Sequence, residues 1–358
     1  MRYDSALAAL GGLRRVALAS PHELQPNLRL AQAYVEAARR DADPRFLGYA
    51  QATLAAWPDD VKTPVEVRLM RATVLQSLHQ FDASLQELDA VVAARPDYAQ
   101  ALLTRATVLL VRGRFAEAQR DCASLLRSGG EVVAELCLGG VASATGRLDV
   151  AASLAARAQQ DMPAADASLH LWAYTLQAET AVRRGDLAAA ASSLEAAMKV
   201  DPQDRYARAM YCDVLLDQGK PERVLDLTAD QALDDNFLLR RALALQALAT
   251  RFPEQVNWTQ QRDDAVRELQ ARHEAARLRG DRTHLREQAR MALFLQHDAH
   301  AALQLAQENW SIQREPADVR ILLEAANAAK DKGARDLVST WMHGSGLVDA
   351  HLSALLRT

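Results

Sequence analysis

A five-residue sequence, Arg-Ala-Thr-Val-Leu, occurs at Arg71–Leu75 and again at Arg105–Leu109, 34 residues later. A phenylalanine follows each copy at the same offset, as Phe81 and as Phe115. A fixed period of this length with helical patterning predicts stacked helix–turn–helix units, each burying its apolar face against its neighbours. Such a chain presents an extended surface, so the repeat constrains the architecture more tightly than it constrains any chemistry.

Inside each period the apolar residues recur every three or four positions, which places them on one stripe of a helix. In the block that begins at Val65, these residues are Leu69, Ala72, Leu75, Leu85, Leu88, Val91 and Val92. Pro96 then ends the second helix, and Gly113 marks the turn inside the next block. Aromatic residues make up only 5% of the chain, as suits closely packed helices. The pattern predicts an all-α fold, a right-handed α-solenoid of stacked repeats.

The repeats resemble those of the tetratricopeptide repeat family, as found in bacterial multi-repeat proteins. Where that family keeps small residues, one bulky residue and a closing proline, the block 171–204 has Ala178, Ala190, Leu194, Ala197 and Pro202. The resemblance is clearest over residues 65–235. Arg71 and Arg105 depart from it, because the family normally has an apolar residue at that place. We expect the stems of these arginines to pack while their guanidinium groups reach solvent.

The regularity of the repeats divides the chain into three parts, which we expect to be continuous. Residues 1–26 read as an N-terminal capping helix, and residues 27–236 read as the repeat array. Residues 237–358 read as a divergent, repeat-like helical part that includes a long charged helix near 257–278. Together these parts predict about nine helix pairs.

The resemblance implies a concave groove, lined by the first helix of each repeat, that holds a peptide or a partner protein. Mapped onto this chain, the groove residues are Thr73, Gln76, Thr107, Trp172, Thr175, Glu179, Arg183, Tyr206 and Asp213. Trp172 and Tyr206 lie 34 residues apart, so they are expected to be neighbours that anchor a peptide. The alternative stays open that both pack against an adjacent helix or against the short insertion at 166–170.

Catalysis has little support in the sequence, which carries no nucleotide-binding, nucleophile-elbow or zinc-protease motif. Since this fold rarely carries catalysis, we expect a non-catalytic protein with no cofactor and no metal ligands. His297 and His300 are three residues apart and offer two ligands of the several that a metal needs. A metal-binding sensor or enzyme that uses them remains an alternative. Asp298 is expected to cap a helix, and His273 is expected to be packed in the interior.

The charges nearly balance, with 42 lysines and arginines against 46 aspartates and glutamates. No nucleic-acid partner is therefore expected. Between residues 262 and 290, arginines alternate with acidic residues, which favours a solvated helix laced with ion pairs. An anion-binding or nucleic-acid surface there is the alternative. No segment approaches the length of a membrane span, so membrane insertion is not expected.

The three cysteines, Cys122, Cys137 and Cys212, form no CxxC pattern, and their odd number leaves at least one unpaired. We expect small buried thiols in a cytoplasmic protein, or a periplasmic protein if a leader peptide was removed. The expected partner is a protein or a peptide. The alternative role is an accessory subunit of a bacterial envelope or secretion assembly that docks through its edge or convex face. Homo-oligomerisation stays open.

Overall fold

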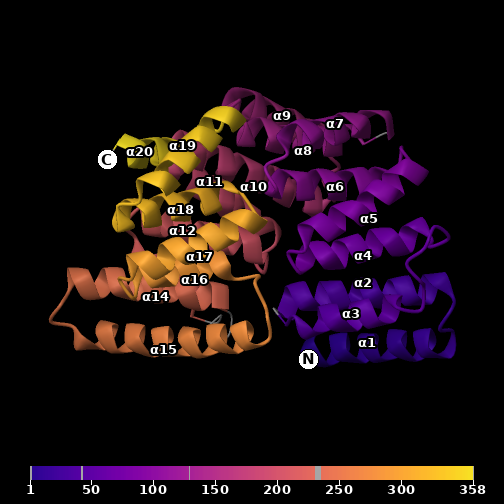
Figure 1. Cartoon of the computed structure of the whole chain (residues 1–358), viewed down its shortest axis with the longest axis horizontal. Helices are drawn as coiled ribbons and strands as arrows, with labels where there is room; N and C mark the ends of the chain where they lie inside the picture. The colour runs from indigo at the N-terminus through magenta and orange to yellow at the C-terminus, as the bar shows by residue number, and fades with distance from the viewer. Residues whose placement is uncertain (1, 42, 129, 230–234, 358) are drawn as a thin grey trace. The chain divides into compact units, whose positions relative to one another are not determined.

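The computed structural model describes residues 2–41, 43–128, 130–229 and 235–357, and over these residues the chain is entirely helical apart from turns and loops (Figure 1). The predicted all-α solenoid is confirmed. In the described residues, an N-terminal helix precedes nine pairs of helices, and a short helix follows them. The helices are α1 (Arg2–Ala19), α2 (Leu24–Asp41), α3 (Arg45–Leu54), α4 (Val65–Ser77), α5 (Phe81–Ala94), α6 (Ala99–Val111), α7 (Phe115–Leu125), α8 (Glu131–Ala144), α9 (Leu148–Asp161), α10 (Ala167–Arg184), α11 (Leu187–Val200), α12 (Arg205–Asp217), α13 (Pro221–Leu227), α14 (Asp235–Arg251), α15 (Val256–Leu278), α16 (Leu285–Phe294), α17 (Ala299–Ile312), α18 (Pro316–Ala329), α19 (Lys332–Ser345) and α20 (Ala350–Arg357), with a 3₁₀ turn at Leu126–Ser128.

The helices pack in consecutive pairs, such as α4 with α5, α10 with α11 and α16 with α17. The chain divides into two compact units, residues 1–109 and residues 110–358, with the boundary inside α6. The divisions expected at residues 26 and 236 rest on the regularity of the repeats and stay predictions.

The core of residues 1–109 joins α1 to α2, α3 and α4. Leu30 and Val35 of α2 lie with Leu47 and Leu54 of α3 and with Val67 of α4, each at most 5% exposed. These residues sit at helical spacing on their own helices, so one apolar stripe from each helix meets the others. Each helix therefore buries its apolar face only because its neighbours are present.

In residues 110–358 the core is built largely from alanine and leucine. In the pair α10 and α11, Ala178, Ala190, Leu194 and Ala197 are fully buried, and they are four of the residues at which the sequence resembles the tetratricopeptide repeat. Small side chains let the helix axes approach closely, and the interior is filled without aromatic bulk. This packing explains the low aromatic content of the chain.

Aspartates begin many of the helices in residues 110–358. Asp166, Asp186, Asp204, Asp298 and Asp331 each accept a hydrogen bond from a backbone N–H in the first turn of the helix that follows. Such a cap satisfies a donor that the helix itself leaves without a partner. The expectation that Asp298 caps a helix is confirmed.

The guanidinium group of Arg71 binds backbone carbonyl groups and is partly buried, so the expectation that it points into solvent is wrong. Its Nη1 atom is buried, and its Nη2 atom donates hydrogen bonds to the carbonyl oxygens of Leu54, at 3.2 Å, and of Trp57. These carbonyls lie at and just beyond the end of α3, where unpaired acceptors attract a cation. Arg105 instead pairs with Asp89 of α5 at 2.8 Å.

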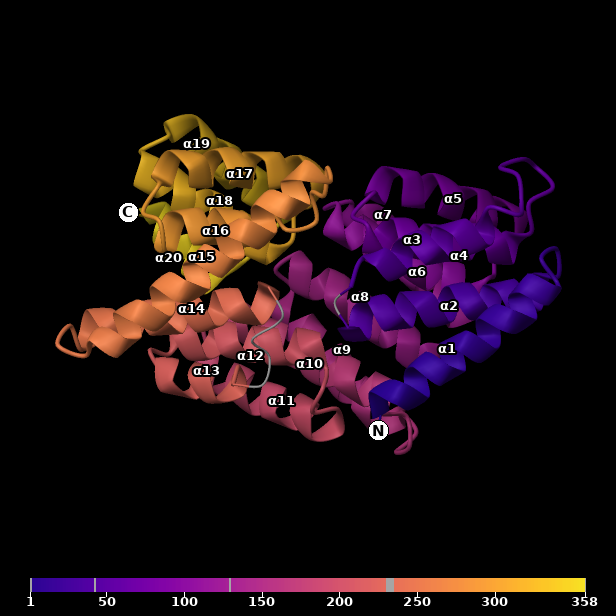
Figure 2. The ribbon, with the colours of Figure 1, turned by 90° about the horizontal axis from the view of Figure 1, so that it is seen from below.

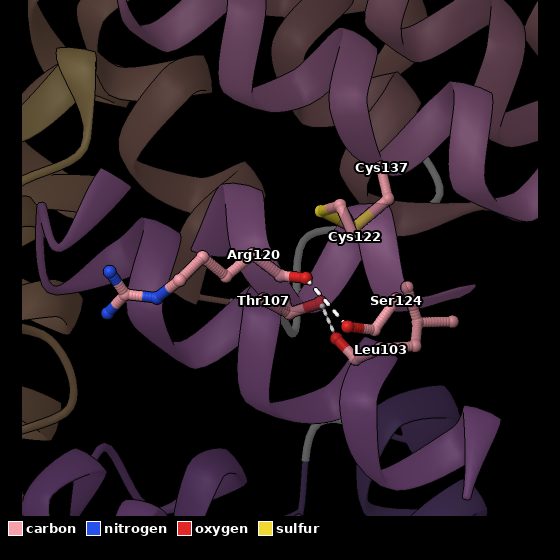
Figure 3. Close-up of a disulfide and its surroundings, with 6 residues drawn as sticks. All are labelled: Leu103, Thr107, Arg120, Cys122, Ser124 and Cys137. Carbon is pink, nitrogen blue, oxygen red and sulfur yellow. Dashed lines mark hydrogen bonds between the residues drawn. A yellow bond between two sulfur atoms is a disulfide. The ribbon is translucent and has the colours of Figure 1, made fainter. Parts of the chain in front are cut away.

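Cys122 of α7 and Cys137 of α8 form a disulfide, with their Cα atoms 5.4 Å apart (Figure 3). The expectation of free thiols is therefore wrong for these two residues, because consecutive helices bring together cysteines that no short motif connects. Cys212 is the unpaired thiol that the odd number of cysteines requires, and it is fully buried. Burial raises the pKa of its thiol to about 12. Among the described helices, none has the length and apolar character that a membrane crossing needs.

Candidate partner-binding surface

In residues 1–109, the expected groove residues lie on the first helices of two successive pairs. Thr73 and Gln76 are on α4 and are half-buried, while Thr107 on α6 is exposed. Thr73 Oγ1 donates a hydrogen bond to the carbonyl oxygen of Leu69 at 3.0 Å, and Thr107 Oγ1 donates to that of Leu103 at 2.9 Å (Figure 3). Each hydroxyl thus donates its hydrogen bond within its own helix, and its oxygen keeps lone pairs that can accept a hydrogen bond.

On α10, the first two expected groove residues belong mainly to the interior. Trp172 is half-buried and packs against a cluster that contains Leu136 and Ala155. Thr175 is only 7% exposed, and its hydroxyl bonds to the carbonyl oxygens of Leu171 and Trp172. For Trp172, this packing favours the alternative in which the indole supports neighbouring helices.

The structure brings three of the expected residues together, from α10 and α12. The Tyr206 hydroxyl donates to Glu179 Oε1 at 2.6 Å, and Glu179 Oε2 lies 3.4 Å from Arg183 Nη1. Arg183 is buried and also donates to Ser143 Oγ of α8 at 2.6 Å. These charge-assisted contacts join three successive first helices on one face.

Tyr206 is 55% exposed, yet its phenol lies in a strongly perturbed environment. Surrounding protein atoms displace bulk water, and with the nearby carboxylates of Glu179 and Glu315 they raise the pKa of the hydroxyl well above its usual value. Glu315 immediately precedes α18. Glu315 therefore lies close enough to act electrostatically on Tyr206, although the two residues belong to different repeats.

Asp213, the last expected groove residue, is already paired within the chain. Arg240 of α14 lies 2.6 Å from its Oδ2 atom, and Arg290 of α16 lies 2.9 Å from its Oδ1 atom. Burial by itself raises the pKa of this carboxyl group, but the two guanidinium groups outweigh it and hold the pKa at about 2. A partner that binds Asp213 competes with these arginines for the carboxylate.

The contacts between first helices continue beyond Asp213, with a partner that sequence reasoning did not identify. Asp217, one turn beyond Asp213, receives two hydrogen bonds from Arg320 of α18, at 2.7 and 2.8 Å. Arg320 also pairs with Glu324 at 2.8 Å. The available signal was an acidic residue on α12 with arginines on three later first helices, but nothing local indicates which arginine meets which aspartate.

The arginines between residues 262 and 290 divide into two groups. On α15, Arg267, Arg272 and Arg277 pair with acidic residues of the same helix, and the predicted ion-pair lacing is confirmed there. On α16, Arg286 and Arg290 were expected on a solvated surface. They pair with Asp318 and Asp213 of other helices instead. The difference arises because α16 is the first helix of its pair, and its arginines reach the first helices α12 and α18.

The fold places the histidines in different surroundings. His273 is 9% exposed, as expected for a packed residue, and burial lowers its pKa. His297 adopts a left-handed backbone with φ of 56°, just before the cap of α17. Within the described ranges, no group of three or more histidine, cysteine, aspartate or glutamate side chains is arranged to hold a metal ion. The metal-binding alternative gains no further ligand from the fold.

Comparison with known proteins follows the repeats. The family model for the tetratricopeptide repeat matches residues 69–131 and 175–237. Among solved structures, the chain is similar to the APC/C hetero-tetramer Cut9–Hcn1, with a TM-score of 0.50 and 13% identity over 94% of this chain and 63% of that chain. At this identity the likeness shows the fold alone. A search of curated proteins finds no match.

Two further structures are similar at lower TM-scores. A tetratricopeptide repeat protein from Parabacteroides merdae ATCC 43184 gives 0.46, with 16% identity over 74% of this chain and 93% of that chain. PilW, described as a widely conserved type IV pilus biogenesis factor, gives 0.44, with 18% identity over 60% of this chain and 98% of that chain.

Proposed function

This chain is a tetratricopeptide repeat protein, and because that family typically mediates protein–protein interactions, we propose that it is a non-catalytic scaffold or adaptor. It holds a peptide or a partner protein against the inner faces of its first helices. One observation carries this proposal: Thr73 of α4 and Thr107 of α6 occupy matching places in successive repeats, and together with Gln76 they keep polar groups outside the apolar core. A partner chain that runs across successive first helices meets such a group in each repeat.

The physical basis is the sum of many modest contacts on a preformed support. Each repeat offers one or two polar side chains, and packed helices hold their backbones in place, so little ordering free energy is lost on binding. A ladder of hydroxyl and amide groups suits a peptide backbone or polar side chains better than it suits an ion. The proposal therefore names a protein or a peptide as the ligand class.

The two groups of groove residues differ in what binding would require. On α4 and α6 the polar groups are half-buried or exposed, so a partner displaces only water. On α10 and α12, Arg183 and Asp213 already have partners in the chain, with which a ligand has to compete. We therefore place the principal contact on Thr73, Gln76 and Thr107.

Site-directed photo-crosslinking in the source cell tests the proposal. A photoreactive amino acid at Gln76 or Thr107 should capture one and the same protein. The matched control is Gln86, an exposed residue of the second helix α5. Capture from Gln86 but not from the groove would contradict the proposal and favour the alternative, an accessory subunit that docks through its edge or convex face.

Loss of binding gives a second readout. The substitution Thr107→Arg adds a long charged side chain at an exposed groove position, so it should weaken binding of the captured protein at least about tenfold. Gln86→Arg should leave the affinity unchanged. Equal affinities for both variants would show that the partner contacts some other surface.

We also propose that the chain folds in an oxidising compartment, such as a bacterial periplasm. The disulfide between Cys122 and Cys137 supports this, because such bonds persist in oxidising compartments and are rare in the cytosol. Protein isolated from the source cell and alkylated in denaturant without reductant should carry one label, on Cys212. Three labels would indicate reduced thiols and a cytoplasmic protein.

A further inference from the structure

Three successive turns in residues 110–358 contact the same short segment near the end of the chain. These turns connect the first and second helices of their pairs at Gly113, Gly146 and Gly185, and each glycine has a left-handed backbone with φ between 73° and 80°. A Cβ atom placed on Gly113 would lie 3.2 Å from Trp341, and one on Gly185 would lie 3.1 Å from Ala350. Glycine therefore serves twice at these turns, since it permits the backbone conformation and leaves room for the segment.

The tightest of these contacts is at Gly146. A Cβ atom there would lie 2.3 Å from the carbonyl oxygen of Gly346 and 2.7 Å from a methyl group of Val348. The backbone oxygen cannot swing away as a flexible side chain can. By contrast, Gly219, at the next turn along the chain, has the same left-handed backbone but no such neighbour within 4 Å.

The contacts keep the order of the repeats. The segment meets the three turns in sequence, Gly113 near residue 341, Gly146 near 346 to 348, and Gly185 near 350. It therefore runs along the stack and bridges three pairs, whereas a helix that merely continued the array would contact only its predecessor. Figure 2 shows how the chain curves from α10–α13 through α14 and α15 to α16–α20 within this unit.

Aromatic and backbone contacts also join the early helices of this unit to its last ones. Trp341 packs edge-to-face against Phe115 of α7, with ring centres 6.0 Å apart, and against Trp310 of α17, at 5.2 Å. The Arg314 amide donates to the carbonyl oxygen of Val111 at 2.8 Å. Apolar burial and a backbone hydrogen bond thus join Phe115 and Val111 to residues far later in the sequence.

Ion pairs also join the earlier first helices of this unit to the later ones. Asp217 of α12 pairs with Arg320 of α18, and Asp213 of α12 pairs with Arg290 of α16. Burial raises the pKa of Asp349, while the Leu352 amide and the Arg183 guanidinium act in the opposite direction, so Asp349 lies within electrostatic reach of α10. The end of the chain therefore approaches both the turns and the inner face of the earlier repeats.

We propose that residues 341–350, the closing segment, form an autoinhibitory contact that holds residues 110–358 closed and limits access of a partner to Glu179, Tyr206 and Asp213. These three residues belong to the second group of groove residues, on α10 and α12, and the inference rests on the proposed function for their role. The closure itself is a property of the chain alone. Release of the closing segment opens the row of turns and separates α18 from α12, and a partner then reaches the inner face.

Hydrogen exchange on the full chain tests the closure without any partner. Gly146→Ala forces a methyl group against the Gly346 carbonyl, so the amides of Gly346, Leu352 and Ser353 should exchange about tenfold faster than in the wild type. Gly219→Ala is the matched control, because it carries the same left-handed strain without the clash. Equal exchange in both variants, whether slow or fast, overturns the proposal.

Access to the inner face is measured with a cysteine probe. Tyr206→Cys introduces a thiol on α12, while Cys212 is buried and the other two cysteines are bonded to each other. A small maleimide should label this cysteine at similar rates in all backgrounds. A maleimide with a long polyethylene glycol chain should label it about tenfold faster when Gly146→Ala is also present, but not with Gly219→Ala. Equal rates with the large reagent count against the proposal.

A second pair of variants covers the case in which Gly146→Ala does not fold. Arg320→Gln removes the two hydrogen bonds to Asp217 and should speed both exchange and labelling with the large reagent. Arg251→Gln is its control, because the partners of Arg251 within the described ranges, Glu222 and the Gly219 carbonyl oxygen, belong to the adjacent repeat. Unchanged rates for Arg320→Gln overturn the proposal. None of these readouts involves a partner, so they are independent of the crosslinking test.

Discussion

Reduction of the Cys122–Cys137 disulfide should destabilise the protein by an amount that the structure predicts. The bond closes a loop between residues 15 apart in sequence. In the chain-entropy account, a closed loop of this length restricts the unfolded chain enough to contribute about 3 kcal/mol at room temperature. Both sulfur atoms lie in the interior between α7 and α8, and reduction leaves the same side chains in place, so the packing term changes little.

The assay is urea unfolding of the wild type with and without reductant, followed by circular dichroism. With a typical slope of about 2 kcal/mol per molar urea, the loss should lower the unfolding midpoint by about 1.5 M. The Cys122→Ala/Cys137→Ala variant is the control, since reductant should not change its midpoint. Thiol counting in denaturant establishes the oxidation state of each sample. A wild type whose midpoint is unmoved by complete reduction would refute the reasoning.

Three other predictions concern single residues. Asp213→Asn leaves Arg240 and Arg290 without their charge partner, so it should lower the free energy of unfolding by about 2 kcal/mol at neutral pH. Since the Asp213 pKa is depressed to about 2, the difference from wild type should shrink as pH falls from about 4 towards 2. Urea titrations at several pH values measure this difference. Burial lowers the His273 pKa, so the free energy of unfolding of the wild type should fall as pH drops below the ordinary histidine value of about 6.5. His273→Leu should make this fall smaller. Plots of unfolding free energy against pH that run parallel for the two proteins would contradict this. Leu194→Ala in the buried core should cost about 3 kcal/mol in thermal or urea unfolding, whereas Val150→Ala, 46% exposed, should stay within about 0.5 kcal/mol; similar losses at both sites would show that the assigned core is wrong.

The helices were largely predictable because their signals are local. The helix that ends before Pro96 and the long charged helix that ends at Leu278 both follow from the local pattern of residues. The buried alanines and Leu194 of the block 171–204 follow from the repeat pattern. In each case the information lies within one period of the chain.

The groove residues show where such reasoning stops. Their places on the first helices follow from the period, but their partners do not. Asp213 was expected to face a ligand and faces Arg240 and Arg290, and Arg183 was expected on an open wall and is buried beside Ser143. These partners come from other repeats, so no spacing within the chain reveals them. The disulfide was missed for a related reason, because Cys122 and Cys137 belong to different helices whose contact is tertiary.

Phe81 and Phe115 illustrate the division between the two kinds of information. Both follow the same five residues at the same distance, and the sequence alone determined that each begins the second helix of a pair. Phe81 lies against His79 of its own turn, whereas Phe115 meets Trp341 from the far end of the chain. Helical periodicity is encoded over a few residues, but closure depends on small rotations added over many repeats. Only the tertiary structure could therefore decide which glycine turns are covered and which aspartates are paired.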